Sequence, residues 1–257
     1  AVLAEETDRA RHAVETEQLR RSLLSSVSHD LRTPLAIITG AASTIVEGRS
    51  IDESTREDLM RTIIDEAERL NRLIRNLLDM TRIESGAIQV KTDWLPVEEV
   101  LGAALNRLDA RLADREIRVE LPPGLPLVPI DPILVEVVLI NLLENAAKYS
   151  DGCIEIRSTV LPGEVLIEVA DDGPGIAPGD EARIFEKFHR SVHAGAPHGV
   201  GLGLAICRAI ATAHGGRIWA QNRSTAGASF KIALPIRGEP PKLELSEPAA
   251  RSVEVRA

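Results

Sequence analysis

The stretch Ser28–Pro34 places an imidazole, a carboxylate and a hydroxyl close together in what reads as a helix. His29 falls two positions before Leu31, off the apolar stripe of that helix, so we expect its ring to face solvent. A neutral imidazole is a competent nucleophile near pH 7, and the adjacent Asp30 can orient it. Thr33 adds a hydroxyl four residues after His29. Alone, this stretch favours a solvated histidine without a chemical role, and the rest of the chain decides against that alternative.

A second group of polar side chains interrupts an otherwise apolar helical segment. Asn141 and Asn145 are four residues apart, so both amides project from one helix face. Amide oxygens are suitable ligands for a phosphate-bound Mg²⁺, and Lys148, one turn after Asn145, adds a positive charge for phosphate. The alternative is a merely solvated polar face. Because Asn is a mediocre helix former, two of them among apolar residues favour a functional role.

An acidic residue directly after a predicted strand begins the sequence Asp171-Asp172-Gly173-Pro174-Gly175. A carboxylate there can accept a hydrogen bond from an exocyclic amine, and the glycines let the backbone approach a flat ring. The alternative is an ordinary turn, because Asp, Gly and Pro are also the residues that turns commonly contain.

A glycine-rich loop, Gly199-Val200-Gly201-Leu202-Gly203-Leu204, opens a predicted helix. Such a loop offers backbone N–H groups and a helix dipole to anionic phosphates. Its spacing differs from the dinucleotide fingerprint and no strand precedes it, which excludes a Rossmann interpretation. Together, the three downstream segments predict a pocket for Mg²⁺, adenine and phosphates.

The element that must position His29 is a long helix with apolar residues at seven-residue intervals, namely Leu24, Leu31, Ile38 and Ile45. We expect this helix to end near Val46 and a second one to run from about Glu53 to Glu84. Two amphipathic helices joined by a short turn form a hairpin that cannot bury both stripes alone. Two copies can do so as an antiparallel four-helix bundle, which predicts a homodimer.

Beyond Gly86 the pattern is that of an α+β domain with helices on one face of a mixed sheet. The predicted helices are 97–113, 132–149 and 202–214, with a short segment at 184–190. The predicted strands are 88–90, 117–121, 153–160, 165–170, 217–221 and 228–234. After Pro235 the chain is rich in Pro and Glu, and we expect a disordered tail.

Composition narrows the class of protein. With 257 residues, 44% hydrophobic and 27% charged, the chain is long enough for one or two ordinary soluble domains. A net charge of −9 without a basic stripe argues against direct nucleic-acid binding. Cys153 and Cys207 are predicted to be buried thiols, not a disulfide or metal pair. No apolar run reaches the ~20 residues of a bilayer span, and the chain begins without Met, so we expect a soluble piece of a longer protein.

The order of these motifs, with Phe185-Glu186-Lys187-Phe188 between the last two, resembles the sensor histidine kinases of two-component systems over about residues 15–236. The resemblance implies a linker helix (1–21), a dimerisation and phosphotransfer hairpin (22–86), an α/β sandwich ATP-binding domain of the Bergerat (GHKL) type (87–236) and a disordered tail (237–257). It also implies ATP and Mg²⁺ as cofactors. The implied partners are a second copy of the chain and the receiver domain of a response regulator.

Residue by residue, the resemblance implies that His29 is the phospho-acceptor, that Asp30 is its general base or orienting partner, and that Thr33 positions water when the regulator is dephosphorylated. Asn145 matches the Mg²⁺ ligand, and Asp171 matches the acid that reads the adenine amino group. The other implied nucleotide contacts are Asn141, Lys148, Tyr149, Gly173, Gly175, Arg190, Gly199, Gly201 and Gly203.

The amino-acid sequence of three stretches is also similar to that of the potassium-responsive KdpD-type kinases. These stretches are 78–86, 138–146 and 203–210. This similarity implies potassium or osmotic signalling, a cytoplasmic location for this piece and a full-length protein anchored in the bacterial inner membrane. His189, His193 and His198 are interpreted as solvated loop residues because no cysteine or acid cluster joins them. The predicted reaction is in-line phosphoryl transfer to His29, then to an Asp of the regulator.

Four alternatives stay open at this point. The kinase could serve another signal, or the chain could be a kinase-inactive dimeric scaffold that only binds a regulator. An ATPase that drives clamp motion and a serine kinase of the anti-sigma type share the ATP site, but neither has a use for the helical hairpin.

Overall fold

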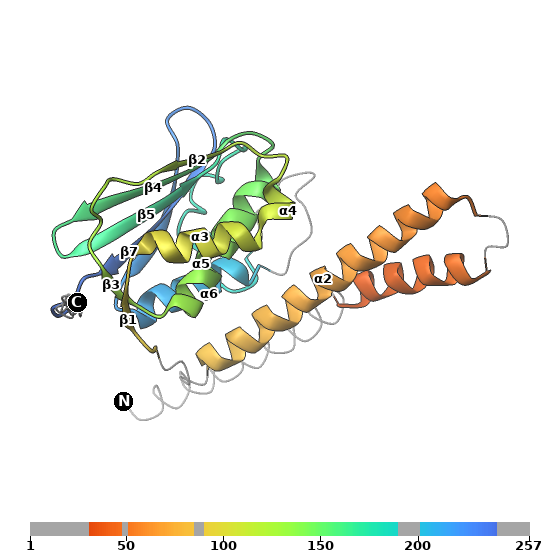
Figure 1. The fold of residues 1–257 in the computed structure, drawn as a ribbon, viewed down its shortest axis with the longest axis horizontal. Coiled ribbons are helices and arrows are strands. Elements are labelled where there is room, and N and C mark those ends of the chain that lie inside the picture. The colour runs from red at the N-terminus through yellow and green to blue at the C-terminus, as the bar shows by residue number, and fades with distance from the viewer. Residues whose placement is uncertain (1–30, 48–50, 85–89, 190–200, 241–257) are drawn as a thin grey trace, which may run out of the picture.

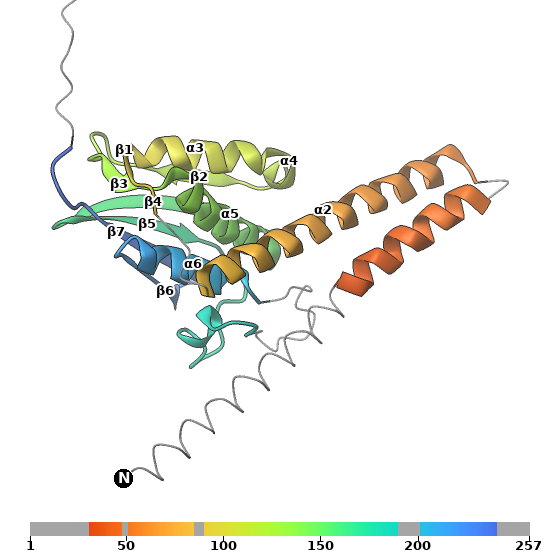
Figure 2. The same ribbon diagram turned by 90° about the horizontal axis from the view of Figure 1, so that it is seen from below.

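The structure is a computed structural model, and it describes residues 31–47, 51–84, 90–189 and 201–240. Two helices form a hairpin that projects from a compact sheet-and-helix domain (Figures 1 and 2). The order of hairpin first and α/β sheet domain second confirms the predicted fold class.

The hairpin consists of a first helix, helical throughout its described residues 31–47, and α2, Glu53–Glu84. The two helices lie side by side in both views (Figures 1 and 2). Asp52 caps the start of α2, since its carboxylate accepts hydrogen bonds from the Thr55 backbone N–H at 2.8 Å and the Thr55 hydroxyl at 2.9 Å. Within the first helix Pro34 and Ala41 are buried, seven residues apart as a helix seam requires. The α2 boundaries confirm the prediction.

The second domain is built on a five-stranded mixed sheet in the order β2-β4-β5-β7-β6. Its strands are β2 (Ile117–Glu120), β4 (Ile154–Leu161), β5 (Glu164–Ala170), β6 (Arg217–Asn222) and β7 (Ala228–Pro235). β2 pairs with β4 in parallel and every other pair is antiparallel. Alternation along the strands buries one face, including Ile154, Ile156 and Ile167.

Three helices pack beside one another: α3 (Val97–Arg107), α5 (Pro132–Tyr149) and α6 (Gly203–Ala213). α5 contacts β4 and β5, and α6 contacts β6 and β7, so they cover the buried face of the sheet (Figure 2). Fully buried Leu139, Leu142 and Ile206 belong to this core. The opposite face of the sheet carries charged pairs, such as Lys231 with Glu168, which lie 3.6 Å apart.

Several elements differ from the sequence predictions. The helix predicted over 97–113 is broken: α3 ends at Arg107 and a short α4 spans Asp109–Leu112, which leaves Leu108 and Leu112 both buried in the core. A second sheet pairs β1 (Asp93–Leu95) with β3 (Val128–Ile130), and neither strand was predicted. Each has three residues and Pro129 lies opposite Trp94, so they carry no alternation signal.

The strand predicted at 88–90 lies largely outside the described residues. The segment predicted at 184–190 is a single 3-10 turn, Arg183–Phe185. Cys207 is buried as predicted, but Cys153 is partly exposed, because it lies at the start of β4 beside the turn at 151–152.

The C-terminal half of α2 rests against the second domain (Figure 2). Leu73 packs on its core and α2 contacts α6. Arg111 pairs with both Glu68 of α2, at 2.8 Å, and Glu144 of α5. Burial raises the pKa of Glu144, and the Arg111 guanidinium opposes that shift. Within the residues that the structure describes, no helix combines the length and apolar character that crossing a membrane requires.

Candidate active site

Helix α5 carries the two asparagines singled out in the sequence, and its start is strongly specified. Pro132 occupies the first helical turn, where its missing N–H costs nothing. The buried Asp131 caps the helix by accepting hydrogen bonds from the backbone N–H groups of Ile133, at 3.1 Å, and Leu134, at 3.2 Å. The same carboxylate accepts from the Lys91 N–H at 3.1 Å. This cap fixes the register of the helix that presents Asn141 and Asn145.

Asn141 connects α5 to the start of α6. Its Nδ2 donates to the Val137 carbonyl one turn back, at 2.8 Å. Its Oδ1 is turned toward Gly203, where a Cβ would lie only 2.5 Å from that oxygen. The structure therefore brings the asparagine motif and the glycine-rich loop into direct contact, and Gly203 is the residue that permits it.

The C-terminal turn of α5 holds Asn145, Lys148 and Tyr149. Asn145 is half-buried, and its side chain has no hydrogen-bond partner among the described residues. The Lys148 ammonium lies 4.8 Å from the centre of the Tyr149 ring and 3.3 Å from its hydroxyl. Tyr149 itself is 41% exposed. An exposed aromatic ring beside a cation suits a flat base with attached phosphates.

Asp171 directly follows the last residue of β5 and is only 4% exposed. Its Oδ1 accepts hydrogen bonds from the backbone N–H groups of Gly173, at 2.9 Å, and Ala228, at 3.3 Å. No donor among the described residues reaches Oδ2, so one oxygen of a buried carboxylate is left to accept. Burial raises the pKa of Asp171, and the two N–H groups only partly offset this shift.

The loop after Asp171 runs against the end of α5. A side chain at Gly173 would collide with the Tyr149 carbonyl oxygen, so the loop and the helix terminus touch through backbone. Asp172 points elsewhere: its carboxylate accepts from the Ser150 hydroxyl and, at 3.2 Å, from the Cys153 N–H. The Asp171 motif and the asparagine motif are thereby joined at Gly173.

Gly201 ties together the two sides of the glycine-rich segment. It adopts φ +71°, and a Cβ there would lie 2.6 Å from the His189 carbonyl oxygen, so both backbone conformation and space require glycine. The Phe188 N–H donates to the Gly201 carbonyl at 2.9 Å. The residues that flank segment 190–200 are therefore held side by side next to α6.

Some predicted site residues cannot be placed and one interpretation is wrong. His29, Asp30, Arg190 and Gly199 lie outside the described residues, as do His193 and His198. Thr33 is half-buried in the first helix. His189 is not a solvated loop residue: its side chain is 12% exposed and its Nε2 lies 3.4 Å from Asp180 Oδ2. The described residues contain no group of three His, Cys, Asp or Glu side chains that could hold a metal ion.

Two residues that the sequence reasoning missed also reach this site. Asn222, the last residue of β6, and Arg223 both hydrogen-bond to the loop that begins at Asp171. They belong to no recognised motif. Polar residues at a strand end are common, so the sequence carries no signal that could have found them.

Comparison with known proteins agrees with this geometry. Residues 130–238 match the family described as histidine kinase-, DNA gyrase B-, and HSP90-like ATPase, and residues 19–86 match the His Kinase A (phospho-acceptor) domain. A phospho-acceptor hairpin followed by an ATPase domain defines the class, and the chain belongs to the histidine kinase family.

The chain is similar to individual histidine kinases in both sequence and structure. The chain is 45% identical over 242 residues to the sensor protein KdpD of Escherichia coli K12, covering 93% of this chain and 27% of that protein. The chain thus spans about a quarter of that relative's length. Histidine kinase ThkA in complex with response regulator protein TrrA superposes with a TM-score of 0.62 at 25% identity over 89% of this chain and 64% of that one. Full-length ShkA in complex with AMPPNP gives 0.61 at 27% identity over 82% and 45%.

Proposed function

We propose that this chain is the core of a sensor histidine kinase that uses ATP to phosphorylate His29 and passes the phosphoryl group to an aspartate of a response regulator. The observation that carries the proposal is Asp171. It is a buried carboxylate with one oxygen saturated by backbone donors and the other left to accept, at the strand end whose loop touches the asparagine-bearing helix α5.

In this proposal Asp171 Oδ2 accepts a hydrogen bond from the adenine amino group, and the exposed Tyr149 ring lies beside the base. Lys148 and Arg190 contact phosphates, and Asn141 lies near them. The remaining nucleotide contacts are backbone ones, at Gly173, Gly175, Gly199, Gly201 and Gly203. The AMPPNP complex of ShkA, a structural relative, is consistent with an adenine nucleotide as ligand.

The donor set also suits Mg²⁺. Asn145 presents an amide without a protein partner among the described residues, and Mg²⁺ is bound through few protein oxygens together with substrate phosphates. We assign Asn145 as the protein ligand, with Asn141 beside it. The ion would supply positive charge that neutralises the triphosphate.

The chemistry of the hairpin follows from His29 and Asp30. In the proposed reaction Asp30 would accept a hydrogen bond from Nδ1–H of the imidazole and leave Nε2 free to attack the γ-phosphorus. The N–P bond forms as the bond from the γ-phosphorus to the bridging oxygen breaks, and ADP leaves with that electron pair. Thr33 would orient water for the reverse task, dephosphorylation of the regulator.

The domain boundaries belong to the same proposal: a linker helix at 1–21, the phosphotransfer hairpin at 22–86, the ATP-binding domain at 87–236 and a disordered tail at 237–257. The end of α2 at Glu84 and the end of β7 at Pro235 are compatible with the limits at 86 and 236.

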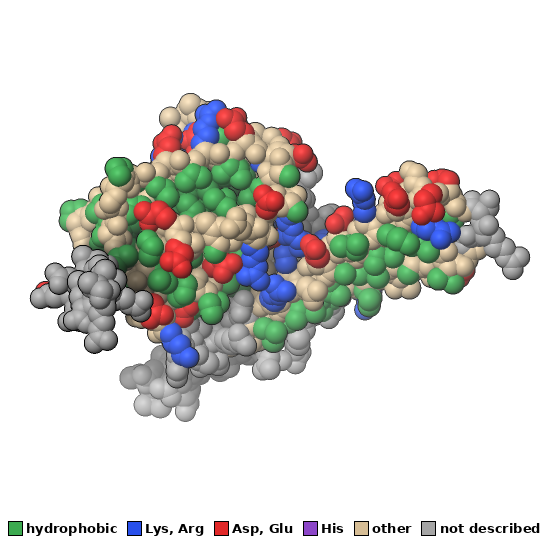
Figure 3. Space-filling model, viewed as in Figure 1, with side chains coloured by type: hydrophobic (Ala, Val, Ile, Leu, Met, Phe, Trp, Pro, Cys, Tyr) green, Lys and Arg blue, Asp and Glu red, His purple; other side chains and the backbone are tan. Residues whose placement is uncertain are grey.

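We further propose that the hairpin dimerises. Of the exposed large hydrophobic residues in the described chain, most lie on the hairpin, where Figure 3 shows apolar side chains gathered. They are Leu35, Ile37, Val46, Met60, Ile64, Ile74 and Leu78. Exposed apolar side chains of this kind are stabilised by a partner, and a second hairpin offers matching ones.

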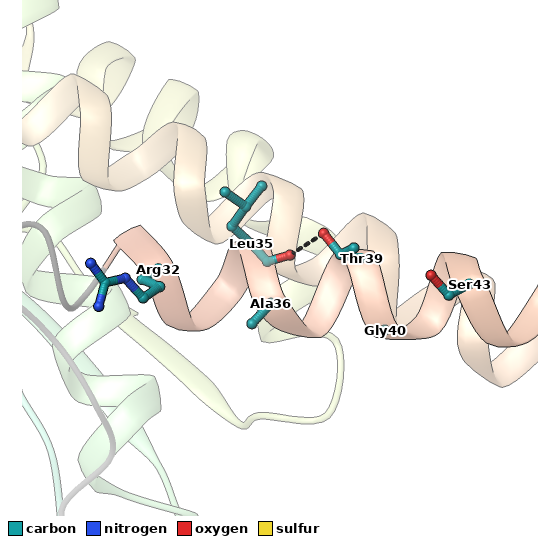
Figure 4. A pocket seen from close by; sticks show the side chains of 6 residues that line it. All are labelled: Arg32, Leu35, Ala36, Thr39, Gly40 and Ser43. Atoms are coloured by element: carbon teal, nitrogen blue, oxygen red, sulfur yellow. Dashed lines mark hydrogen bonds between the residues drawn. The ribbon is translucent and has the colours of Figure 1, made fainter.

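The regulator's receiver domain has a candidate surface on the first helix, which shares Leu35 with the apolar surface just described. An open groove of about 400 Å³ runs along the first helix and is lined by Arg32, Leu35, Ala36, Thr39, Gly40 and Ser43 (Figure 4). Helical spacing places positions 36, 40 and 43 on the face that continues from position 29. A receiver domain that takes a phosphoryl group from His29 must lie over this face. The ThkA complex with TrrA, a response regulator, supports a partner of this kind.

The signal is proposed from similarity alone. The identity to KdpD favours potassium or osmotic signalling. The cytoplasmic location of this core and a membrane anchor elsewhere in the full-length protein remain predictions from the family resemblance.

Incubation with γ-labelled ATP tests the proposal directly. The label should be acid-labile and base-stable, as phosphohistidine is, and His29→Gln should abolish it while nucleotide titration still shows binding. His12→Gln, in the proposed linker helix, is the matched control and should label normally. Label retained in His29→Gln, or an acid-stable and base-labile product, would overturn the assignment.

A further inference from the structure

The last residue of edge strand β6, Asn222, hydrogen-bonds to the loop that follows Asp171. Asn222 Oδ1 accepts a hydrogen bond from the Ile176 backbone N–H at 2.6 Å, and its Nδ2 donates to the Ile176 carbonyl at 2.8 Å. The side-chain amide therefore pairs with both backbone groups of one residue, as a neighbouring strand would. Ile176 is buried, so these backbone groups depend on Asn222 for their hydrogen bonds.

The next residue, Arg223, holds the other end of the same loop. Its Nη1 donates to the Asp171 carbonyl at 3.2 Å, and its Nη2 donates to Glu155 Oε1 at 3.0 Å. Glu155 lies near the start of β4, so the guanidinium links the loop to that strand. This interaction lowers the pKa of Glu155, which keeps the pair charged at neutral pH.

Gly175 shows how closely the loop and Asn222 are matched. It adopts φ +79°, and a Cβ at this position would lie 2.6 Å from Asn222 Oδ1. The absence of a side chain lets the amide reach the backbone of Ile176. The glycine and the asparagine are more than forty residues apart in sequence, and together they define the path of the loop.

We propose that Asn222 and Arg223 are positioning residues that fix the loop so that Asp171 Oδ2 faces the adenine amino group, and that they thereby set the preference for adenine over guanine. The inference rests on the proposed nucleotide site and names what controls its specificity. Guanine carries a carbonyl where adenine carries the amine, so a rigid acceptor at this place discriminates between them, and a displaced one does not.

The contacts decide which variants are informative. Asn222→Ala removes both hydrogen bonds to Ile176. Asn222→Asp keeps the shape and the acceptor for the Ile176 N–H but loses the donor, so it should fall between the parent and the alanine variant. Arg223→Lys keeps the charge but cannot bridge Asp171 and Glu155 as a planar fork.

Arg217→Ala is the matched control. Arg217 begins the same strand and forms a two-point ion pair with Glu164, with both contacts at 2.6 Å, at the end of β6 remote from the loop. Its loss perturbs the edge strand to a similar degree without touching the loop.

Titration of the full chain with fluorescent ATP and GTP analogues, alongside thermal unfolding, tests the inference. Asn222→Ala should weaken ATP-analogue binding about tenfold and reduce the ATP-over-GTP preference, whereas Arg217→Ala should leave both unchanged. An Asn222→Ala protein that keeps the parental preference, or that weakens both nucleotides equally, overturns the positioning role. A parental protein that shows no preference for ATP would instead overturn the proposed function.

Discussion

At the scale of single residues, Asp171 shows a conflict between folding and function. Burial raises the pKa of its carboxyl group, so the folded state binds a proton more tightly than the unfolded chain does. The resulting loss of stability is absent below the unfolded pKa, builds as the pH rises through the interval between the two pKa values, and is complete above the folded pKa. The protein thus keeps a destabilising charge at neutral pH, as expected where one carboxylate oxygen is reserved for a ligand.

Asp171→Asn should separate the two effects. The amide oxygen can still accept from Gly173 and Ala228, and the burial of charge is relieved. The unfolding temperature at neutral pH should therefore stay equal or rise, and the difference from the parent should narrow on acidification. ATP binding should weaken by roughly 10–100-fold, because an amide NH₂ would face the adenine amine, donor against donor. Thermal unfolding at several pH values and nucleotide titration measure both effects.

Asp172→Asn is the control, since we expect it to change both the unfolding temperature and the nucleotide affinity differently from Asp171→Asn. The Ser150 hydroxyl lowers the pKa of Asp172, so its carboxylate contributes stability above the unfolded pKa that is lost as the pH falls. This variant should lower the unfolding temperature at neutral pH and keep nucleotide affinity. A destabilised Asp171→Asn protein that binds ATP normally would contradict the assignment.

At the scale of elements, the sequence predicts what periodicity and caps encode. α2 and α5 begin and end where predicted, because α2 has a long amphipathic pattern and α5 a capping Asp131 with Pro132. β1 and β3 escape prediction because three residues show no alternation. The motif glycines were predicted from local sequence, whereas Asn222 acts on Ile176 through a contact between β6 and a distant loop. Such a contact exists only after the sheet has formed.

The groove on the first helix can be blocked at Gly40. Gly40 lines the groove and has open space around its Cβ position, so Gly40→Gln should fill the groove without a clash. The helix should gain ~0.5 kcal/mol, since Gln is the better helix former. Autophosphorylation should be unaffected, while phosphotransfer to the receiver domain should slow about tenfold or more as the docking face is lost.

Gly102→Gln provides a comparison for that experiment. Gly102 lies in α3 and also has open space around its Cβ position, but it is far from the groove. Its substitution should gain similar helix stability and leave both reactions unchanged. Parental phosphotransfer rates in Gly40→Gln would show that the receiver domain docks elsewhere.

At the scale of the whole molecule, two kinds of contact hold the hairpin. Its contact with the sheet domain combines Leu73 with the ion pairs of Arg111, and exposed pairs of this kind contribute only about 0–1 kcal/mol each. Its outer face instead carries Met60, Ile64, Ile74 and Leu78, which the spacing places on one side of α2. The sheet domain is therefore lightly attached, and the apolar face of α2 is the surface that we expect to pair with a second hairpin.

Ile64→Glu should convert the dimer to a monomer. Ile64 is 58% exposed in the single chain, and each dimer would bury two copies of it. Losing burial of that exposed fraction costs ~0.9–1.7 kcal/mol per side chain, so two copies raise the dimer dissociation constant by about 20- to 350-fold, before any cost of burying the new charge. Ile133→Glu is the control, because Ile133 is 72% exposed on the ATP-binding domain and contributes nothing to the hairpin face. Sedimentation equilibrium should give a monomer for the first variant and a dimer for the second, and an intact Ile64→Glu dimer would place the pairing face elsewhere.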